Sequence, residues 1–287
     1  SIVENNGISI MAQTENICPA DKAIYALRDV TGTIESIPLI CGSILSKKIA
    51  EGINTLMLDV KYGNGAFMET IKDAKQLGNM LKKIGENFNI KIYPNYTSMN
   101  EPLGNSCGLW CEIIESINTL KGIGPEDLTE VVKYLAVTTL NRLGYKESVK
   151  KVDNVIKNGN ALKIFYKMIE KHSGDINSVK QNTINKPKYE AYIFSKEHGI
   201  INSMNTKKIG LTLIELGAGR KTAEDILDNS AGIIFEKKCN SKVEKGEKIA
   251  KIFCSDKNNL KKGIIMLESS ISLSNQKSNL LPLIYKG

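Results

Sequence analysis

The first part of the chain alternates between short apolar runs and longer stretches with helical periodicity. Residues 55–60 form an apolar run of strand length, and residues 90–93 form a second one. Between them, apolar residues recur at helical spacing: Met68, Ile71, Ala74, Leu77, Leu81 and Ile84. A similar pattern after the second run carries Trp110, Ile113, Ile114 and Ile117. This strand–helix–strand–helix order predicts an α/β fold with a parallel sheet, in which ligands bind at the carboxyl ends of the strands.

Helical patterns continue through the middle of the chain. One begins after Gly124-Pro125, and two more cover about residues 146–157 and 159–171. The following stretch, residues 173–188, is polar and rich in Asn and Lys, which makes it the best candidate for a linker.

After this linker the pattern changes to short strands with two helices, at 206–216 and at about 256–271. We therefore expect two domains. Residues 1–187 would form a central α/β domain, with a mixed or parallel sheet, flanking helices and part of a helical domain at its N-terminal end. Residues 188–287 would form a smaller α+β domain.

One predicted helix has a face of unusual composition. Pro38 follows Ser36 closely, which is typical of a helix start because the missing N–H of Pro is not needed in the first turn. One face of this helix then carries Ile40, Ser43, Ile44 and Lys47. We expect a short strand and a loop upstream, from about residue 8, with Arg28 in the loop. Two apolar groups, a hydroxyl and an ammonium, with a guanidinium near by, suit a small flat ligand with polar edges.

The composition is that of a globular protein without a membrane span. The 287 residues are 41% hydrophobic and 24% charged, and no run approaches the roughly 20 apolar residues that a span needs. No secretory signal is recognisable at the start, which is Ser1 and not Met. We therefore expect the sequence to be a processed product, an expression product or part of a longer chain. Six scattered cysteines indicate a reduced, cytoplasmic protein. Cys107 and Cys111 lack a second Cys/His pair, so we interpret them as buried thiols and not as metal ligands.

The net charge of +8 comes from lysines dispersed along the chain. Aromatic residues make up only 6%, and they do not interleave with basic residues into a stacking platform. We therefore expect a solvated lysine surface, no nucleic-acid partner, and at most a mild preference for anionic substrates.

Three segments carry a likeness to a known family. The first reads Arg-Asp-Val-Thr-x-Thr-x-x-Ser-Ile-Pro-Leu-Ile from Arg28, followed by Ser-Ile-Leu-x-Lys-Lys from Ser43. The others are residues 58–68 and 217–220, Gly-Ala-Gly-Arg. In these segments the chain resembles the thymidine phosphorylase / pyrimidine-nucleoside phosphorylase family. The resemblance implies a pentosyltransferase that cleaves thymidine or uridine reversibly, with phosphate as co-substrate, to free base and pentose 1-phosphate. It implies no organic cofactor and a cytoplasmic homodimer.

The resemblance also implies roles for residues in a helical base-binding segment at about residues 20–50. Positions matching Arg28, Ser43 and Lys47 hold the pyrimidine through its carbonyl oxygens and ring nitrogen. Three others line the apolar side of the pocket: Ile40, Ile44 and Phe67. Arg28 and Lys47 would stabilise the negative charge that develops on the departing base, which makes them the catalytic candidates. The alternative for both is a salt-bridged structural role.

Some family members bind a structural monovalent cation or Ca²⁺. The resemblance assigns its ligands to the carbonyl oxygens of Leu103 and Ser106 and to the carboxylate of Glu115. The alternative for Glu115 is an ordinary carboxylate on a surface helix.

The family's Lys-His-Ser-Thr-Gly-Gly phosphate loop has no counterpart in the 287 residues. Gly63-Asn64-Gly65 and Gly217-Ala218-Gly219-Arg220 are too short to replace it. We expect this chain alone to bind base weakly without turnover, and dimerisation to use N-terminal helices that it lacks. Two alternatives stay open: a non-catalytic nucleobase-binding remnant, or one subunit of a split phosphorylase. A third alternative is a related phosphoribosyl transferase, but the presence of Arg28, Ser43 and Lys47 disfavours it.

Overall fold

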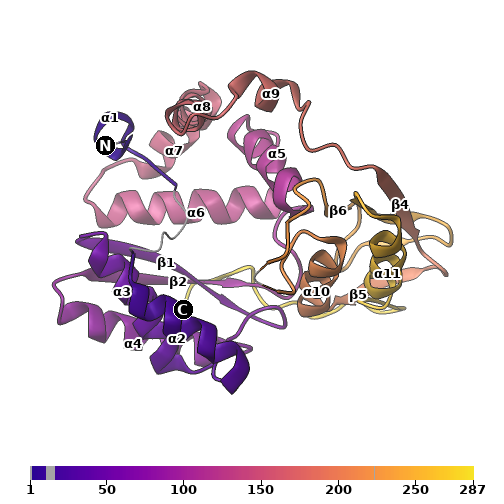
Figure 1. The fold of residues 1–287 in the computed structure, drawn as a ribbon, viewed down its shortest axis with the longest axis horizontal. Helices are drawn as coiled ribbons and strands as arrows, with labels where there is room; N and C mark the ends of the chain where they lie inside the picture. Colours follow the sequence, from indigo (N-terminus) through magenta and orange to yellow (C-terminus); the bar gives the residue numbers. More distant parts are fainter. Residues whose placement is uncertain (1, 11–16, 223) are drawn as a thin grey trace. The chain divides into compact units, whose positions relative to one another are not determined.

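A computed structural model describes residues 2–10, 17–222 and 224–287 of the protein (Figure 1). The contacts divide the chain into two compact units, Ser9–Ser98 with Ile284–Gly287, and Ser1–Ile8 with Met99–Leu283. The boundary expected between residues 187 and 188 stays a prediction. Among the described helices, none has both the length and the apolar character needed to cross a membrane.

The unit containing Ser9–Ser98 has a mixed three-stranded sheet in the order β1-β2-β10. Strands β1 (Thr55–Tyr62) and β2 (Lys91–Ser98) are parallel, as predicted, and β10 (Ile284–Tyr285) joins β2 antiparallel. Helix α4 (Ile71–Glu86) connects the parallel strands, beginning at the Thr70 N-cap. Apolar side chains from these elements form one core with helix α3 (Ile37–Ala50): Cys41, Leu45, Val60, Tyr62, Met68, Ala74, Leu77, Leu81, Ile90 and Ile92.

Arg28 lies in a helix, and its expected place in a loop was wrong. Helix α2 spans Pro19–Thr31, with Pro19 in the first turn. It ends at Gly32, which has a φ of 65° and donates its N–H to the Arg28 carbonyl. A left-handed conformation of this kind is easily adopted only by glycine, so Gly32 ends the helix. The short strand expected from about residue 8 is not found in residues 8–10, and residues 11–16 lie outside the described part of the chain.

The first half of the other unit is helical. Helix α1 (Ile2–Asn6) contacts α8, and strand β3 (Ser106–Gly108) leads directly into α5. The helices that follow are α5 (Leu109–Leu120), α6 (Glu126–Arg142), α7 (Ser148–Lys157), α8 (Asn160–Lys171) and α9 (Ile176–Gln181). Helix α9 lies within the stretch that the sequence suggested as a linker. It forms there because Asp175 caps its N-terminus through the N–H groups of Asn177 and Ser178.

The second half of this unit has two antiparallel sheets, in the orders β3-β6-β8-β4 and β7-β5-β9. The strands are β4 (Tyr189–Phe194), β5 (Gly199–Met204), β6 (Gly232–Phe235), β7 (Lys242–Val243), β8 (Lys248–Cys254) and β9 (Ile271–Ser274). Helices α10 (Thr206–Leu216) and α11 (Lys257–Glu268) pack on each other. The closing helix is thus shorter than expected, because Ile271 begins β9. Buried residues of the two sheets and of helices α10 and α11 form one core, which includes Ile201, Leu216, Ile233, Ile252 and Leu267.

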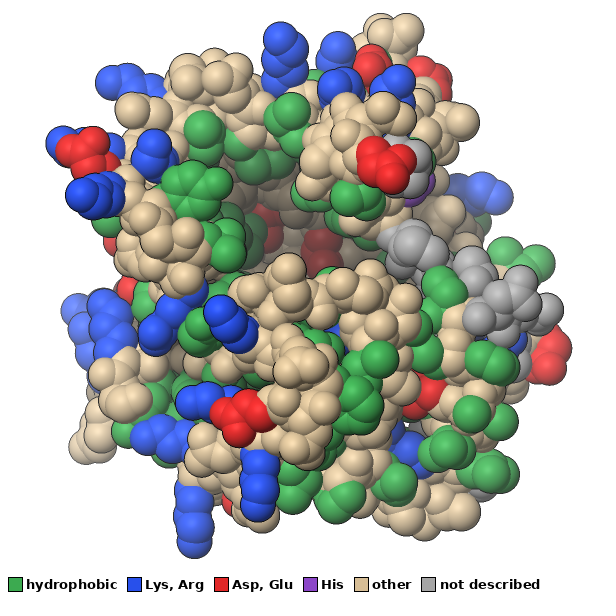
Figure 2. Space-filling view, turned by 90° about the vertical axis from the view of Figure 1, so that its left-hand side faces the viewer, with side chains coloured by type: hydrophobic (Ala, Val, Ile, Leu, Met, Phe, Trp, Pro, Cys, Tyr) green, Lys and Arg blue, Asp and Glu red, His purple; other side chains and the backbone are tan. Residues whose placement is uncertain are grey.

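Lysine and arginine side chains are scattered over the face shown in Figure 2, and several stand beside acidic side chains. Ion pairs of this kind include Lys48–Glu51 and Lys150–Glu147. This distribution agrees with the predicted solvated lysine surface.

Candidate functional site

Helices α2 and α3 bring a hydroxyl, an ammonium and a carboxylate together. Ser43 and Lys47 lie one turn apart on α3, and Lys47 Nζ donates a hydrogen bond to Ser43 Oγ at 2.9 Å. The same ammonium donates to Asp21 Oδ2 at 2.6 Å, which joins α3 to the first turn of α2. Asp21 is not marked by the sequence pattern, because an acidic residue in the first turn is common in helices.

Arg28 lies in the last turn of α2 and is only 4% exposed. Its Nη2 donates to the carbonyl oxygen of Ile34, and its guanidinium carbon is 5.2 Å from the centre of the Tyr25 ring. Its Nε is buried without a hydrogen-bond partner among the described residues. A buried N–H donor without an acceptor is costly, and such groups are rare in folded proteins. Arg28 therefore holds one donor that none of the described residues accepts.

The charges of this cluster act on Asp21. Burial alone would raise the pKa of the Asp21 carboxyl. Hydrogen bonds from Lys47 and Ser43, together with the charges of Lys47 and Arg28, outweigh burial and hold that pKa below its ordinary value. Asp21 is thus an anion at neutral pH, with the hydroxyl and both cations around it. Lys47 thus forms a salt bridge, with Asp21, as the structural alternative for this residue supposed. Arg28 instead donates a hydrogen bond to the carbonyl oxygen of Ile34.

The apolar residues assigned by resemblance lie in different settings. Ile40 and Ile44 are half-buried on α3 and pack against the core of their unit. Phe67 lies in the turn between β1 and α4, where its side chain is 58% exposed. The roles of all six assigned residues in binding a base stay predictions.

A second polar network lies at the carboxyl ends of β1 and β2. Lys61 Nζ is 2.7 Å from Asp59 Oδ2 and donates to Thr97 Oγ1 at 2.8 Å. Thr97, which is fully buried, donates to Asp59 Oδ1 at 2.5 Å. Asp59 and Lys61 project from the same face of β1 because they are two residues apart. This network joins the strands next to the turn at residues 63–68.

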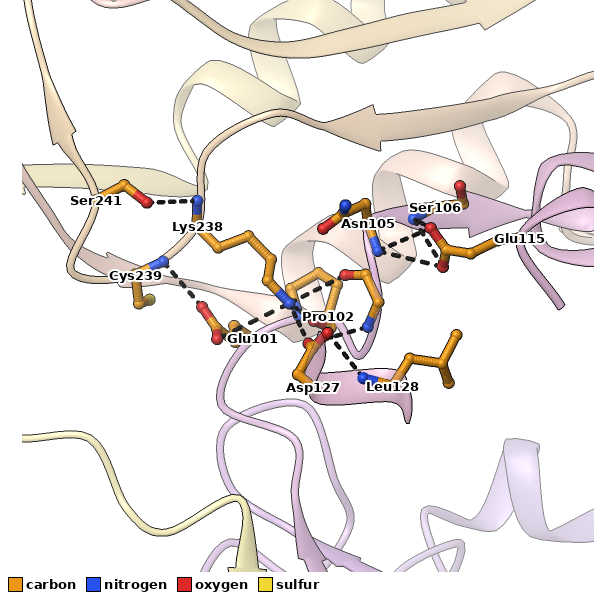
Figure 3. Close-up of polar contacts among 11 residues, drawn as sticks. Glu101, Pro102, Asn105, Ser106, Glu115, Asp127, Leu128, Lys238, Cys239 and Ser241 are labelled. Carbon is orange, nitrogen blue, oxygen red and sulfur yellow. Dashed lines mark hydrogen bonds and ion pairs between the residues drawn. The ribbon is translucent and has the colours of Figure 1, made fainter. Parts of the chain in front are cut away.

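The residues assigned to a cation lie in the other unit, and the contacts of Glu115 there are with backbone N–H groups. Both Glu115 oxygens accept from the N–H groups of Asn105 and Ser106, at 3.0 to 3.2 Å (Figure 3). Within the described parts of the chain, no group of three or more His, Cys, Asp or Glu side chains could hold a metal ion. The contact of Leu103, Ser106 and Glu115 with a cation stays a prediction.

All six cysteines are free in the structure, with Cys107 buried and Cys111 half-buried. Burial raises the pKa of both Cys107 and Cys111 to about 12, so these thiols are protonated at neutral pH.

Comparison of the sequence with known protein families gives two matches. Residues 1–162 match the glycosyl transferase family, a/b domain, and residues 200–274 match the pyrimidine nucleoside phosphorylase C-terminal domain. The chain belongs to the pyrimidine-nucleoside phosphorylase family. The resemblance drawn from the three sequence segments is therefore confirmed.

Two relatives in this family show how far the likeness extends. The pyrimidine-nucleoside phosphorylase of Staphylococcus haemolyticus is 40% identical over 280 residues, which is 96% of this chain and 64% of the relative. That of Bacillus subtilis is 39% identical over 262 residues, or 90% of this chain and 60% of the relative. The chain thus spans somewhat less than two thirds of the length of these phosphorylases.

Proposed function

We propose that this chain takes part in the phosphorolysis of pyrimidine nucleosides and binds the base through α2 and α3. One observation carries the proposal: in a member of this family, Arg28 and Lys47 retain donors that no described residue accepts. Arg28 has its buried Nε, and the described contacts of Lys47 use two of its three N–H donors. A pyrimidine presents carbonyl oxygens that would accept both.

The chemistry suits these groups. Phosphate oxygen forms a bond to the anomeric carbon of the pentose, and the bond from that carbon to the base nitrogen breaks with its electron pair on the base. The departing base therefore gains negative charge. Charged donors from Arg28 and Lys47 at its oxygens would stabilise that charge more than they stabilise the neutral nucleoside, which lowers the barrier. Ser43 can donate or accept, so it suits the ring nitrogen beside a carbonyl.

In this proposal Asp21 positions Lys47 and is not itself a catalytic residue. It holds the ammonium beside Ser43 before any base arrives, so that less side-chain freedom is lost on binding. Because the Lys47 side chain stays 28% exposed, its remaining donor can reach a ligand.

We propose further that the enzyme uses phosphate as its co-substrate without an organic cofactor. A cytoplasmic homodimer is also proposed. These points rest on the family resemblance, and the free cysteines are consistent with a reducing compartment.

The test measures base binding and turnover separately. Uracil and thymine are titrated into the chain by calorimetry, and release of base from uridine and thymidine is followed with phosphate present. Lys47→Met should weaken base binding at least about tenfold, as for one lost charged hydrogen bond, and Ser43→Ala should weaken it by about three- to tenfold, as for one lost neutral hydrogen bond. Lys48→Met is the matched control, since Lys48 is the next residue on α3 and pairs with Glu51.

Equal base affinity in wild type, Lys47→Met and Lys48→Met would contradict the proposed site. Base binding without turnover, alongside an active relative as positive control, would favour the nucleobase-binding or split-subunit alternative over a complete catalyst. Turnover that Lys47→Met abolishes would establish the phosphorylase.

A further inference from the structure

One lysine outside the α2–α3 cluster is surrounded by oxygen atoms. Lys238 lies in the segment between β6 and β7, and its Nζ donates to the carbonyl oxygens of Pro102 and Gly104 at 2.9 and 3.0 Å (Figure 3). It also pairs with the Asp127 carboxylate and lies 4.0 Å from Glu101 Oε1. All three donors of the ammonium are therefore used, and its side chain is only 16% exposed.

The oxygen atoms around Lys238 Nζ are of the kinds that coordinate hard cations in proteins. Backbone carbonyl and carboxylate oxygens are the usual ligands of such ions, whereas lysines on a surface mostly point their ammonium into water. Here the positive charge among these oxygen atoms is the ammonium of Lys238, which is covalently attached to the chain.

The anions around the same loop are also provided by the chain. Asp127 Oδ2 accepts from the N–H of Gly104 at 3.1 Å, and Glu101 Oε2 accepts from the N–H of Cys239 at 2.9 Å. On the other side, Glu115 accepts from Asn105 and Ser106 as described. The loop at residues 101–106 is thus held by carboxylates at its N–H groups and by one ammonium at two of its carbonyl groups.

This arrangement fits a bound cation poorly at Glu115. The backbone N–H groups that point at both of its oxygens carry positive partial charge, and a cation there would have to compete with them. The carbonyl groups of Pro102 and Gly104 are bound by Lys238, and that of Asn105 accepts from the N–H of Phe235 at 2.8 Å, so three carbonyl groups of the loop already have donors.

We propose that Lys238 is the built-in cation of the loop at residues 101–106, and that this loop needs no bound K⁺, Na⁺ or Ca²⁺. Removal of the ammonium would leave Asp127 and Glu101 without their cation and two carbonyl groups without a donor. A variant without it should then require the ion that the wild-type chain does not.

The experiment compares melting temperatures in choline, sodium, potassium and ammonium chloride at one ionic strength, and with added CaCl₂. The wild-type chain should melt within about 1 °C in all of them. Lys238→Met should melt at least about 5 °C lower in choline chloride, as breaking a largely buried ion pair implies. Potassium or ammonium ions should restore at least about half of that loss. Lys237→Met is the control, since Lys237 is the preceding residue and pairs with Glu247 at 2.7 Å.

Hydrogen exchange gives a local readout. In Lys238→Met the amides of Gly104, Asn105 and Ser106 should exchange at least about tenfold faster, with amides of α4 unchanged. Lys238→Arg is the second variant, for use if Lys238→Met does not fold. It keeps the positive charge, so it should melt at the same temperature in every salt.

Two results would overturn the proposal. One is a wild-type chain that gains several degrees from K⁺ or Ca²⁺ at constant ionic strength, which would favour the bound cation at Leu103, Ser106 and Glu115. The other is a Lys238→Met chain as stable as Lys237→Met.

Discussion

Two lysines, one in each compact unit, occupy similar surroundings but differ in one respect. Lys47 and Lys238 both contact a carboxylate and a neutral oxygen atom at hydrogen-bond distance. Around Lys238 every donor has an acceptor. The described contacts around Lys47 leave one donor of the ammonium unused, and Arg28 near by has a buried Nε without a partner. Unused buried donors cost stability, and proteins commonly break such local rules at functional sites. We therefore expect the cluster around Lys47 to bind a ligand and the cluster around Lys238 to be structural.

The largest effect is expected at Gly104, inside the filled cluster. Gly104 has a φ of 73°, and a Cβ there would clash with Glu115 Oε2. Gly104→Ala should therefore lower the free energy of unfolding by about 3 kcal/mol, through backbone strain and the displaced carboxylate. Urea unfolding followed by the fluorescence of Trp110, the one tryptophan, measures this.

Gly144→Ala is the matched control for that variant. Gly144 has a φ of 83° but nothing within 4 Å of its Cβ position, so only the strain of about 1 kcal/mol should appear. Equal losses in the two variants would mean that the 101–106 loop is not tightly filled, which would remove the contrast between the two clusters.

A smaller effect on stability, with a larger one on binding, is expected at Arg28. Arg28→Met removes a buried charge with an unused donor but also the hydrogen bond to the Ile34 carbonyl, so the two effects offset and the free energy of unfolding should change by less than about 1 kcal/mol. Base affinity should fall at least about tenfold. Calorimetric melting and base titration of the same sample give both values. Strong destabilisation with unchanged base affinity would instead assign Arg28 a structural role.

The smallest effect is the pH dependence due to Asp21. The pKa of its carboxyl is lower in the folded chain than its ordinary value of 3.8. The folded state therefore binds fewer protons than the unfolded one, and the stability that Asp21 contributes is present above this value and lost as the pH falls through the folded pKa.

Asp21→Asn should accordingly be less stable than wild type by about 1 kcal/mol between about pH 5 and pH 8, and the difference should shrink below about pH 4. Urea unfolding followed by circular dichroism across this range measures it. A difference that grows as the pH falls would have the wrong sign for a lowered pKa. It would mean that Asp21 is not ion-paired with Lys47 in solution.

Much of the fold follows from local patterns. The apolar runs at residues 55–60 and 90–93 became β1 and β2, and the amphipathic segment between them became α4, because period 2 and period 3.6 place apolar groups on one side of each element. Errors arose where a local cue was weak or absent. Helix α2 was missed around Arg28 because its pattern is broken by polar residues, although Pro19 and Gly32 mark its two ends.

The sequence by itself determined that Ser43 and Lys47 share a helix face, since residues four apart on a helix are neighbours whatever surrounds them. It also determined the family, through segments whose residues match in order. Only the tertiary structure decided the partners of the two lysines. Asp21 is 26 positions from Lys47, and Pro102 and Asp127 are 136 and 111 positions from Lys238. No local periodicity relates positions so far apart. Their meeting depends on how helices and sheets pack, because burial of apolar faces brings these polar atoms together.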